Sequence, residues 1–101
     1  MVSSLTGRDM LLRRIISLLQ HRPYVAGRMA ADAAGNVVNP VSALADPTVA
    51  LSLRGAIIAV AGRGAPGMIH ELGIVSRFEP KTKREAMLFL QSHMSRVGER
   101  K

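Results

Sequence analysis

The first part of the chain has the hydrophobic spacing of an amphipathic α-helix. Its apolar residues recur every three to four positions and fall on one broad side: Leu11, Leu12, Ile15, Ile16, Leu18 and Leu19. The polar residues of this segment take the other side: Asp9, Arg13, Arg14, Ser17 and Gln20. Thr6 and Asp9 have the spacing of a capping box, and Pro23 cannot continue a helix. The pattern predicts a helix over residues 7–21 with its apolar stripe in the core.

The hydrophobic pattern changes after Pro23. Asp32 precedes a turn signal at Gly35-Asn36, and short segments at residues 25–31 and 37–38 flank that turn. These features predict a small β-hairpin or a structured loop after the first helix. Two strands alone are marginally stable, so we expect this element to lean on the helices. Asn39-Pro40 can open a short helical turn.

A second helical pattern follows Asp46-Pro47, which has the form of an N-cap followed by proline at the first helical position. Apolar residues recur at helical spacing through this run: Val49, Ala50, Leu53, Ile57, Val60 and Ala61. The run covers about 16 residues, whereas a strand usually has about 5–6. We therefore predict a helix from Pro47 that ends at Gly62, with Gly62 as its C-terminal stop.

The last third of the chain predicts two further helices. Pro66 favours a short helix over residues 67–74, and Phe78-Glu79-Pro80 interrupts the pattern. Thr82 and Glu85 form a capping box, which predicts a helix from near Lys83 to about Val97. Its expected inner face consists of Ala86, Leu90, His93, Met94 and Val97.

Composition agrees with a helical fold. The chain has no Trp, one Tyr and two Phe, so its core must be aliphatic, and Ala and Met favour helices over an aromatic-rich sheet. The expected fold is mainly α: a compact bundle of about four helices with the small hairpin or loop after the first. We expect one domain over residues 1–101, with residues 1–5 and 98–101 frayed.

Several classes of function are disfavoured by the residues present. There is no cysteine, which removes disulfides, thiolate nucleophiles and cysteine-based metal sites. No apolar run approaches the roughly 20 residues that span a bilayer, and the first ten residues lack the order of a signal peptide. These features predict a cytoplasmic protein without a membrane partner.

The glycines Gly62, Gly64 and Gly67 match the spacing G-x-G-x-x-G of dinucleotide-binding loops. That function needs a strand before the first glycine and an acidic residue at the end of another strand about 20 positions later. The preceding segment has a helical pattern, and Glu85, at the right distance, belongs to a helix start. We therefore interpret the three as loop glycines.

Catalytic and metal-binding patterns are also incomplete. His70-Glu71 resembles the start of a metalloprotease motif, but Ile74 stands where the second histidine would be. The three histidines are scattered and the carboxylates are few. We predict no enzymatic activity, no cofactor and no metal site.

The charge of the chain favours anionic partners. Lys and Arg number 14 against 7 acidic residues, a net charge of +7, and eleven of the 14 are Arg, which binds phosphate and carboxylate with a planar fork. Four cations fall within residues 77–84 at a helix start, where free N–H groups also favour phosphate. The candidate anion or nucleic-acid contacts are Arg13, Arg14, Arg77, Lys81, Lys83 and Arg84, with Phe78 able to stack on a base. The alternative is a solvated loop that Glu79 and Glu85 partly neutralise.

Leu88 departs from the pattern of the last helix because it lies roughly opposite Ala86 and Leu90, among polar residues. With Met87 beside it, Leu88 predicts a surface for a partner protein or for self-association. Single exposed leucines are common, so an ordinary surface residue is the alternative.

Three short motifs carry a resemblance to a known family. They are Ala31-Asp32-Ala33-Ala34-Gly35, then Asp46-Pro47-x-x-Ala50, then Leu53-Arg54-Gly55-Ala56-Ile57. In their order they resemble a family of small bacterial and bacteriophage proteins of unknown function, over about residues 8–97. The resemblance implies a compact, mostly helical fold without catalytic residues, in which Asp32, Gly35, Asp46 and Gly55 are structural. Glycine inside a helix costs roughly 1 kcal/mol, so we expect a close helix crossing at Gly55.

The sequence thus favours a small basic, non-catalytic protein that acts through protein–protein contacts, as a phage or accessory factor and as a dimer. The partner is an unidentified protein or a second copy. The alternative function is a nucleic-acid-binding module that uses residues 77–84 and the arginines of the first helix.

Overall fold

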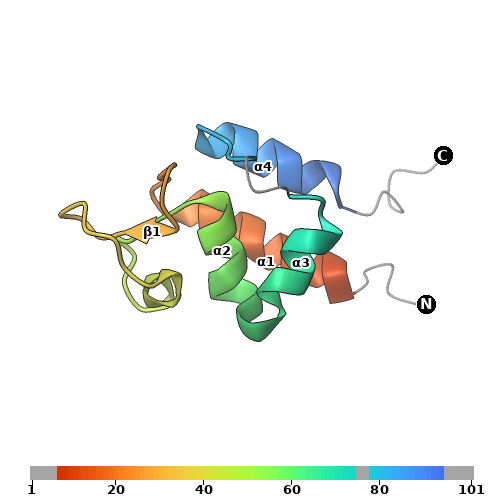
Figure 1. Cartoon of the computed structure of the whole chain (residues 1–101), viewed down its shortest axis with the longest axis horizontal. Coiled ribbons are helices and arrows are strands. Elements are labelled where there is room, and N and C mark those ends of the chain that lie inside the picture. The colour runs from red at the N-terminus through yellow and green to blue at the C-terminus, as the bar shows by residue number, and fades with distance from the viewer. Residues whose placement is uncertain (1–6, 75–77, 95–101) are drawn as a thin grey trace.

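The computed structural model describes residues 7–74 and 78–94 (Figure 1). Its α-helices are α1 (Gly7–His21), α2 (Leu53–Ala61), α3 (Ala65–Glu71) and α4 (Lys83–Ser92), with 3-10 turns η1 (Pro40–Leu44) and η2 (Gly62–Gly64). Strands β1 (Ala30–Ala31) and β2 (Ala50–Leu51) form a two-stranded antiparallel sheet. The prediction of a mainly helical chain with a small antiparallel β element is confirmed. The sheet differs from the predicted hairpin, because β1 pairs with residues 50–51, whereas Ala31 and Val37 form an isolated bridge. No helix of the described residues is long and apolar enough to cross a membrane.

Helix α1 has the predicted bounds and packs against both α2 and α4. Leu12, Ile15 and Leu19 are fully buried in the core, as the apolar stripe predicted. Asp9, however, was predicted on the polar side and is buried. It lies three residues before Leu12 and so shares the inner face of the helix, where the partial positive charge of the first turn favours a carboxylate.

The segment after α1 contains the predicted turn. Ala31 and Val37 form an antiparallel bridge, and the Asp32 N–H donates to the Asn36 carbonyl at 2.9 Å. The Asp32 carboxylate accepts from the N–H groups of Ala34 and Asn36, which closes the turn from inside. Figure 1 shows this segment and η1 at the left end of the molecule, away from α3.

The predicted helix from Pro47 is wrong in its first part. Residues Ala50 and Leu51 form β2, and α2 begins only at Leu53, with Ser52 as its N-cap. Asp46 instead caps a turn by accepting from the N–H and hydroxyl of Thr48. The extended conformation is favoured here because the backbone of Leu51 forms hydrogen bonds with a remote segment. The Leu51 N–H donates to the Pro23 carbonyl, and the Leu51 carbonyl accepts from the Val25 N–H. These bonds cannot form if residues 49–51 are helical.

The C-terminal end of α2 is as predicted. Gly62 terminates α2 with φ +57, a left-handed conformation that favours glycine. The stretch before G-x-G-x-x-G is therefore a helix and not a strand. Gly64 and Gly67 follow in η2 and α3.

Gly55 is buried in α2 where another segment crosses closely. A Cβ added there would overlap the carbonyl oxygen of Met29 and contact the Leu51 side chain. The close approach predicted at Gly55 is confirmed, but the crossing element is the backbone just before β1 and not a second helix.

Helix α4 begins at the predicted residue and ends earlier than predicted. The Thr82 hydroxyl accepts from the Glu85 N–H at 3.2 Å, and the Glu85 carboxylate accepts from the Lys81 N–H at 2.9 Å. The helix ends at Ser92, and the N–H of His93 then donates to Leu90 in a tighter turn. Val97, with the frayed ends predicted at 1–5 and 98–101, lies outside the described residues.

Candidate functional site

The segment before α4 is held in place by two long-range hydrogen bonds. The Tyr24 hydroxyl donates to the carbonyl of Pro80, and the Gly27 N–H donates to the carboxylate of Glu79. Pro80 is buried. Residues 78–81 therefore form a fixed wall beside α4, fastened to the loop between α1 and β1.

An apolar groove of about 590 Å³ lies between this wall and α4. It is lined by Phe78, Glu79, Pro80, Lys81, Glu85, Leu88 and Phe89. The ring centroids of Phe78 and Phe89 lie 4.8 Å apart, and the His93 ring lies 4.7 Å from that of Phe89 at a tilt of 59°. These contacts preorganise the aromatic side of the groove.

Leu88 lies at the edge of this groove with 54% of its surface exposed. The sequence placed it on the outer side of the helix, which is confirmed. Met87 does not share its position: it is half-buried and packs against the core. Helical geometry explains the difference, because adjacent residues point about 100° apart.

The six predicted basic contacts are not all neighbours. Arg13, Arg14, Lys81 and Arg84 are exposed, whereas the Lys83 ammonium donates to the Gln20 carbonyl at 3.5 Å, at the end of α1. Arg14 contributes to another hollow of about 380 Å³, lined by Arg14, Ser17, Leu18, His21, Arg22, Leu44 and Val60. Arg77 lies outside the described residues.

Arg22, directly after α1, is held by η1. Its guanidinium donates twice to the Ala43 carbonyl, at 3.2 and 3.0 Å. These two hydrogen bonds hold η1 against the end of α1, so Arg22 has a structural role.

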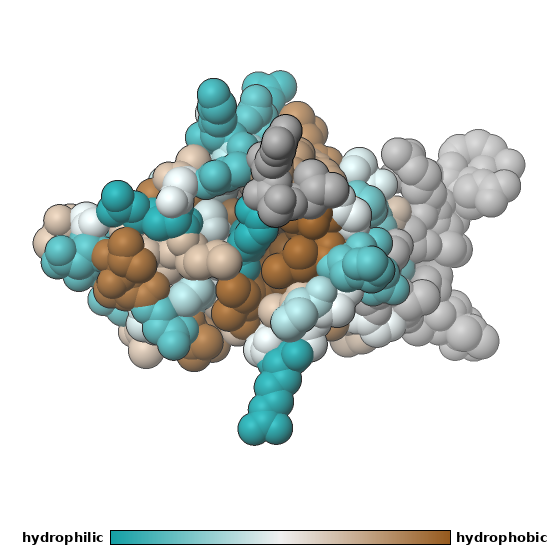
Figure 2. All heavy atoms as spheres, viewed as in Figure 1, coloured by the Kyte–Doolittle hydropathy of each residue, from teal (hydrophilic) through white to brown (hydrophobic). Residues whose placement is uncertain are grey.

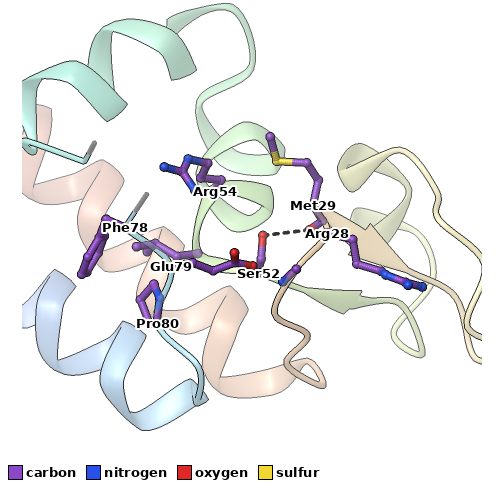
Figure 3. A pocket seen from close by; sticks show the side chains of 9 residues that line it. Arg28, Met29, Ser52, Arg54, Phe78, Glu79 and Pro80 are labelled. Atoms are coloured by element: carbon purple, nitrogen blue, oxygen red, sulfur yellow. Dashed lines mark hydrogen bonds between the residues drawn. The ribbon is translucent and has the colours of Figure 1, made fainter. Parts of the chain in front are cut away.

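A smaller cleft of about 240 Å³ lies on the other side of the 78–80 wall (Figure 3). Ser52 lines it and donates to the Met29 carbonyl at 3.1 Å. Arg28 also lines the cleft, but the outer part of its side chain points away from it. The Arg28 guanidinium instead donates to the Gly35 carbonyl at 2.8 Å. Phe78, Glu79 and Pro80 line both the cleft and the groove, so the two hollows share one wall.

Two groups have pKa values shifted by their surroundings. Burial raises the pKa of the Tyr24 phenol above 10.0, and the negative charge of Glu79 adds to that shift. Hydrogen bonds from Thr48 lower the pKa of the exposed Asp46 carboxyl. Among residues 7–74 and 78–94, no three His, Asp or Glu side chains gather closely enough to hold a metal ion.

Sequence reasoning found Leu88 and Lys81 but missed Phe89 and Pro80 as groove residues. The break at Phe78-Glu79-Pro80 was visible, but nothing local shows that it folds back along α4. The signal that could have found the groove is the pair Phe78 and Phe89, the two phenylalanines of the chain, whose rings contact each other in its lining.

Comparisons with models of protein families, with curated proteins and with solved structures gave no match. The resemblance to small bacterial and bacteriophage proteins therefore stays a prediction.

Proposed function

We propose that this chain is a non-catalytic binding protein that acts through protein–protein contact, and that the groove beside α4 is its binding surface. One observation carries the proposal: the predicted outlier Leu88 is exposed and borders a concave apolar groove with paired aromatic rings. Concave apolar surfaces rimmed by polar groups are typical of protein–protein binding sites.

The framework around the groove supports this function. Residues 78–81, the wall of the groove, are held by the hydrogen bonds from Tyr24 and Gly27. The N-terminus of α4, beside the groove, is capped by Thr82 and Glu85. In this proposal the helices form a compact bundle that presents the groove with little ordering cost on binding. The absence of cysteine and the family resemblance favour a cytoplasmic accessory protein of bacterial or phage type.

The rim of the groove adds charge to the apolar surface. Lys81 lines it and Arg84 is exposed nearby in the first turn of α4. The carboxylates of Glu79 and Glu85 also line it, but both accept backbone N–H groups, from Gly27 and Lys81. The ammonium and guanidinium groups are thus the charges best placed to meet a partner.

Selection of helical peptides from a displayed library, with the whole protein as bait, tests this proposal. The selected peptides should bind Leu88→Lys at least tenfold more weakly than the wild type in fluorescence anisotropy, because the ammonium disrupts an apolar contact. The matched control is Met10→Lys, since Met10 on α1 is 57% exposed and Leu88 is 54% exposed. Equal affinity for the two variants, or a selection without binders, would contradict the proposal.

The second candidate is nucleic-acid binding, and one observation favours it: Arg14, His21 and Arg22 line the same hollow beside α1. The nucleic-acid-binding surface would consist of this hollow together with Lys81 and Arg84. Anisotropy with duplex DNA, single-stranded DNA and RNA at about 50 and about 200 mM salt tests it, because phosphate contacts weaken steeply with salt. Binding that Lys81→Glu with Arg84→Glu abolishes, and Leu88→Lys leaves intact, would favour this candidate over the first.

A further inference from the structure

One stripe of α4 joins the groove to an exposed cation at its rim. Arg84 and Leu88 are four residues apart in the helix, so their side chains are neighbours on the same face. Both are exposed, and Leu88 lines the groove. Figure 2 shows hydrophilic and hydrophobic side chains next to each other at the top of the molecule, where Figure 1 places α4. A cation therefore stands one helical turn before the apolar contact residue.

Two cations at this end of the groove are available to a partner. Lys81 lines the groove, and neither its ammonium nor the Arg84 guanidinium forms a hydrogen bond or ion pair within the part of the chain that the structure describes. Lys83 differs from them because its ammonium donates to the Gln20 carbonyl. Lys81 and Arg84 can thus meet negative charges that a partner brings.

Two carboxylates also line the groove and restrict the kind of anion that it can take. Those of Glu79 and Glu85 accept the N–H groups of Gly27 and Lys81, which holds them at the wall and at the start of α4. Their charge repels a polyanion laid along the groove, such as a nucleic-acid strand. A peptide can instead place a single carboxylate beside Arg84 and apolar side chains in the rest of the groove.

We propose that the groove binds an acidic amphipathic helix of a partner protein. An apolar residue of that helix packs against Leu88 and the two phenylalanine rings, and a carboxylate meets Arg84 and Lys81. This inference rests on the proposed function of the groove as a protein-binding surface and names the chemistry of its partner. Charge complementarity supports it, because residues 78–89 hold three cations and two carboxylates, and the whole chain has a net charge of +7.

The order of residues along α4 also gives the partner an orientation. Gln91 and Ser92, which follow Leu88 on the same face, are exposed and neutral, so the cations lie at one end of the stripe only. The carboxylate of the partner therefore lies near the start of α4, and its apolar residue lies one turn further along. A helix supplies that spacing, because its own residues i and i+4 are one turn apart.

Peptide selection tests the acidic character of the partner without assuming a sequence. A displayed library of helical peptides, with Asp and Glu as frequent as Lys and Arg, is selected against the wild type and against the double variant Lys81→Glu with Arg84→Glu. Peptides that bind the wild type should be enriched in Asp and Glu. Those that bind the variant should be enriched in Lys and Arg, because its rim charge is reversed. Circular dichroism checks that the variant is folded.

The contact at Arg84 is measured by fluorescence anisotropy with the acidic peptide that binds the wild type most tightly. Arg84→Glu should weaken binding about five- to tenfold, and the wild-type affinity should fall between about 50 and about 200 mM salt. Glutamate is favourable in the first turn of a helix, so this variant should fold.

Arg63→Glu is the matched control for Arg84→Glu, because it makes the same change of charge elsewhere. Arg63 of η2 is exposed and lines none of the three hollows described above. Figure 1 shows the turn between α2 and α3 on the side of the molecule away from α4. The control should bind the acidic peptide within about twofold of the wild type.

Other outcomes overturn the inference. Selected peptides enriched in Lys and Arg would show that the charge of Glu79 and Glu85 prevails. Equal losses in Arg84→Glu and Arg63→Glu would indicate attraction by net charge without a contact at Arg84. A single-stranded oligonucleotide that displaces the peptide at about equal concentration would make a nucleic acid the occupant.

The failure of this inference and that of the proposed function give different results. Peptides without a charge bias that still lose affinity in Leu88→Lys would leave the groove as a protein-binding surface and make only the acidic partner wrong. A selection without binders would contradict both.

Discussion

Among the glycines that the structure describes, Gly55 is the one at which packing leaves the least room for a side chain. A methyl group there would meet the Met29 carbonyl oxygen, and a backbone atom cannot move aside as a flexible side chain can. We expect Gly55→Ala to lower the free energy of unfolding by about 3 kcal/mol. Urea denaturation followed by circular dichroism measures this change.

Gly67 provides the matched control for Gly55. It also lies in a helix, α3, but a Cβ added there would meet nothing within 4 Å. Gly67→Ala should therefore raise the free energy of unfolding by about 0.5–1 kcal/mol through helix propensity alone. If both substitutions change stability equally, the close approach at Gly55 is wrong.

Tyr24 gives the fold a dependence on alkaline pH. Burial raises the pKa of its phenol above 10.0, so the native state holds this proton more tightly than the unfolded state. The stabilisation is complete below pH 10 and is lost as pH rises through the folded-state pKa. Because the chain has one Tyr and no Trp, tyrosinate absorbance reports Tyr24 directly.

We expect the tyrosinate absorbance of the native protein to give a titration midpoint for Tyr24 at higher pH than that of the urea-unfolded chain. The drop in stability above pH 10 should also be smaller in Tyr24→Phe than in the wild type. A native midpoint at or below the unfolded one would contradict the buried phenol.

At the scale of elements, Ser52 determines where β2 ends and α2 begins. Its hydroxyl accepts from the Gly55 N–H at 3.0 Å and donates to the Met29 carbonyl at 3.1 Å. Ser52→Ala should therefore cost about 1–2 kcal/mol of unfolding free energy. Asp46→Ala, at the residue that the sequence predicted as this helix cap, should cost much less in the same thermal or urea experiment.

Local signals predicted the elements that local interactions stabilise. The bounds of α1, the cap of α4 at Thr82 and the stop at Gly62 all depend on residues within one turn of each other. Strand β2 depends on Pro23, Val25 and Met29, more than 20 residues away, while Val49 and Ala50 happen to continue the helical spacing of α2. Periodicity alone could not separate these two possibilities.

At the scale of the whole molecule, the candidate site was only partly visible in the sequence. Leu88 was identifiable because a leucine among polar residues breaks the helical pattern. The groove itself requires Pro80 to be fastened to Tyr24, across 56 positions of the chain. The basic residues were also found, but the fold places Arg14 and Lys83 against different neighbours.

Chemical-shift mapping on the isotopically labelled protein tests the central claim most directly. A peptide selected for binding is added stepwise, and the backbone amides of three surfaces are compared: the groove, the cleft around Ser52 and the hollow around Arg14. The account predicts that the largest changes fall on residues 78–81 and 85–89. Largest changes around Arg14 and Arg22, or around residues 27–29 and 52–54, would contradict it.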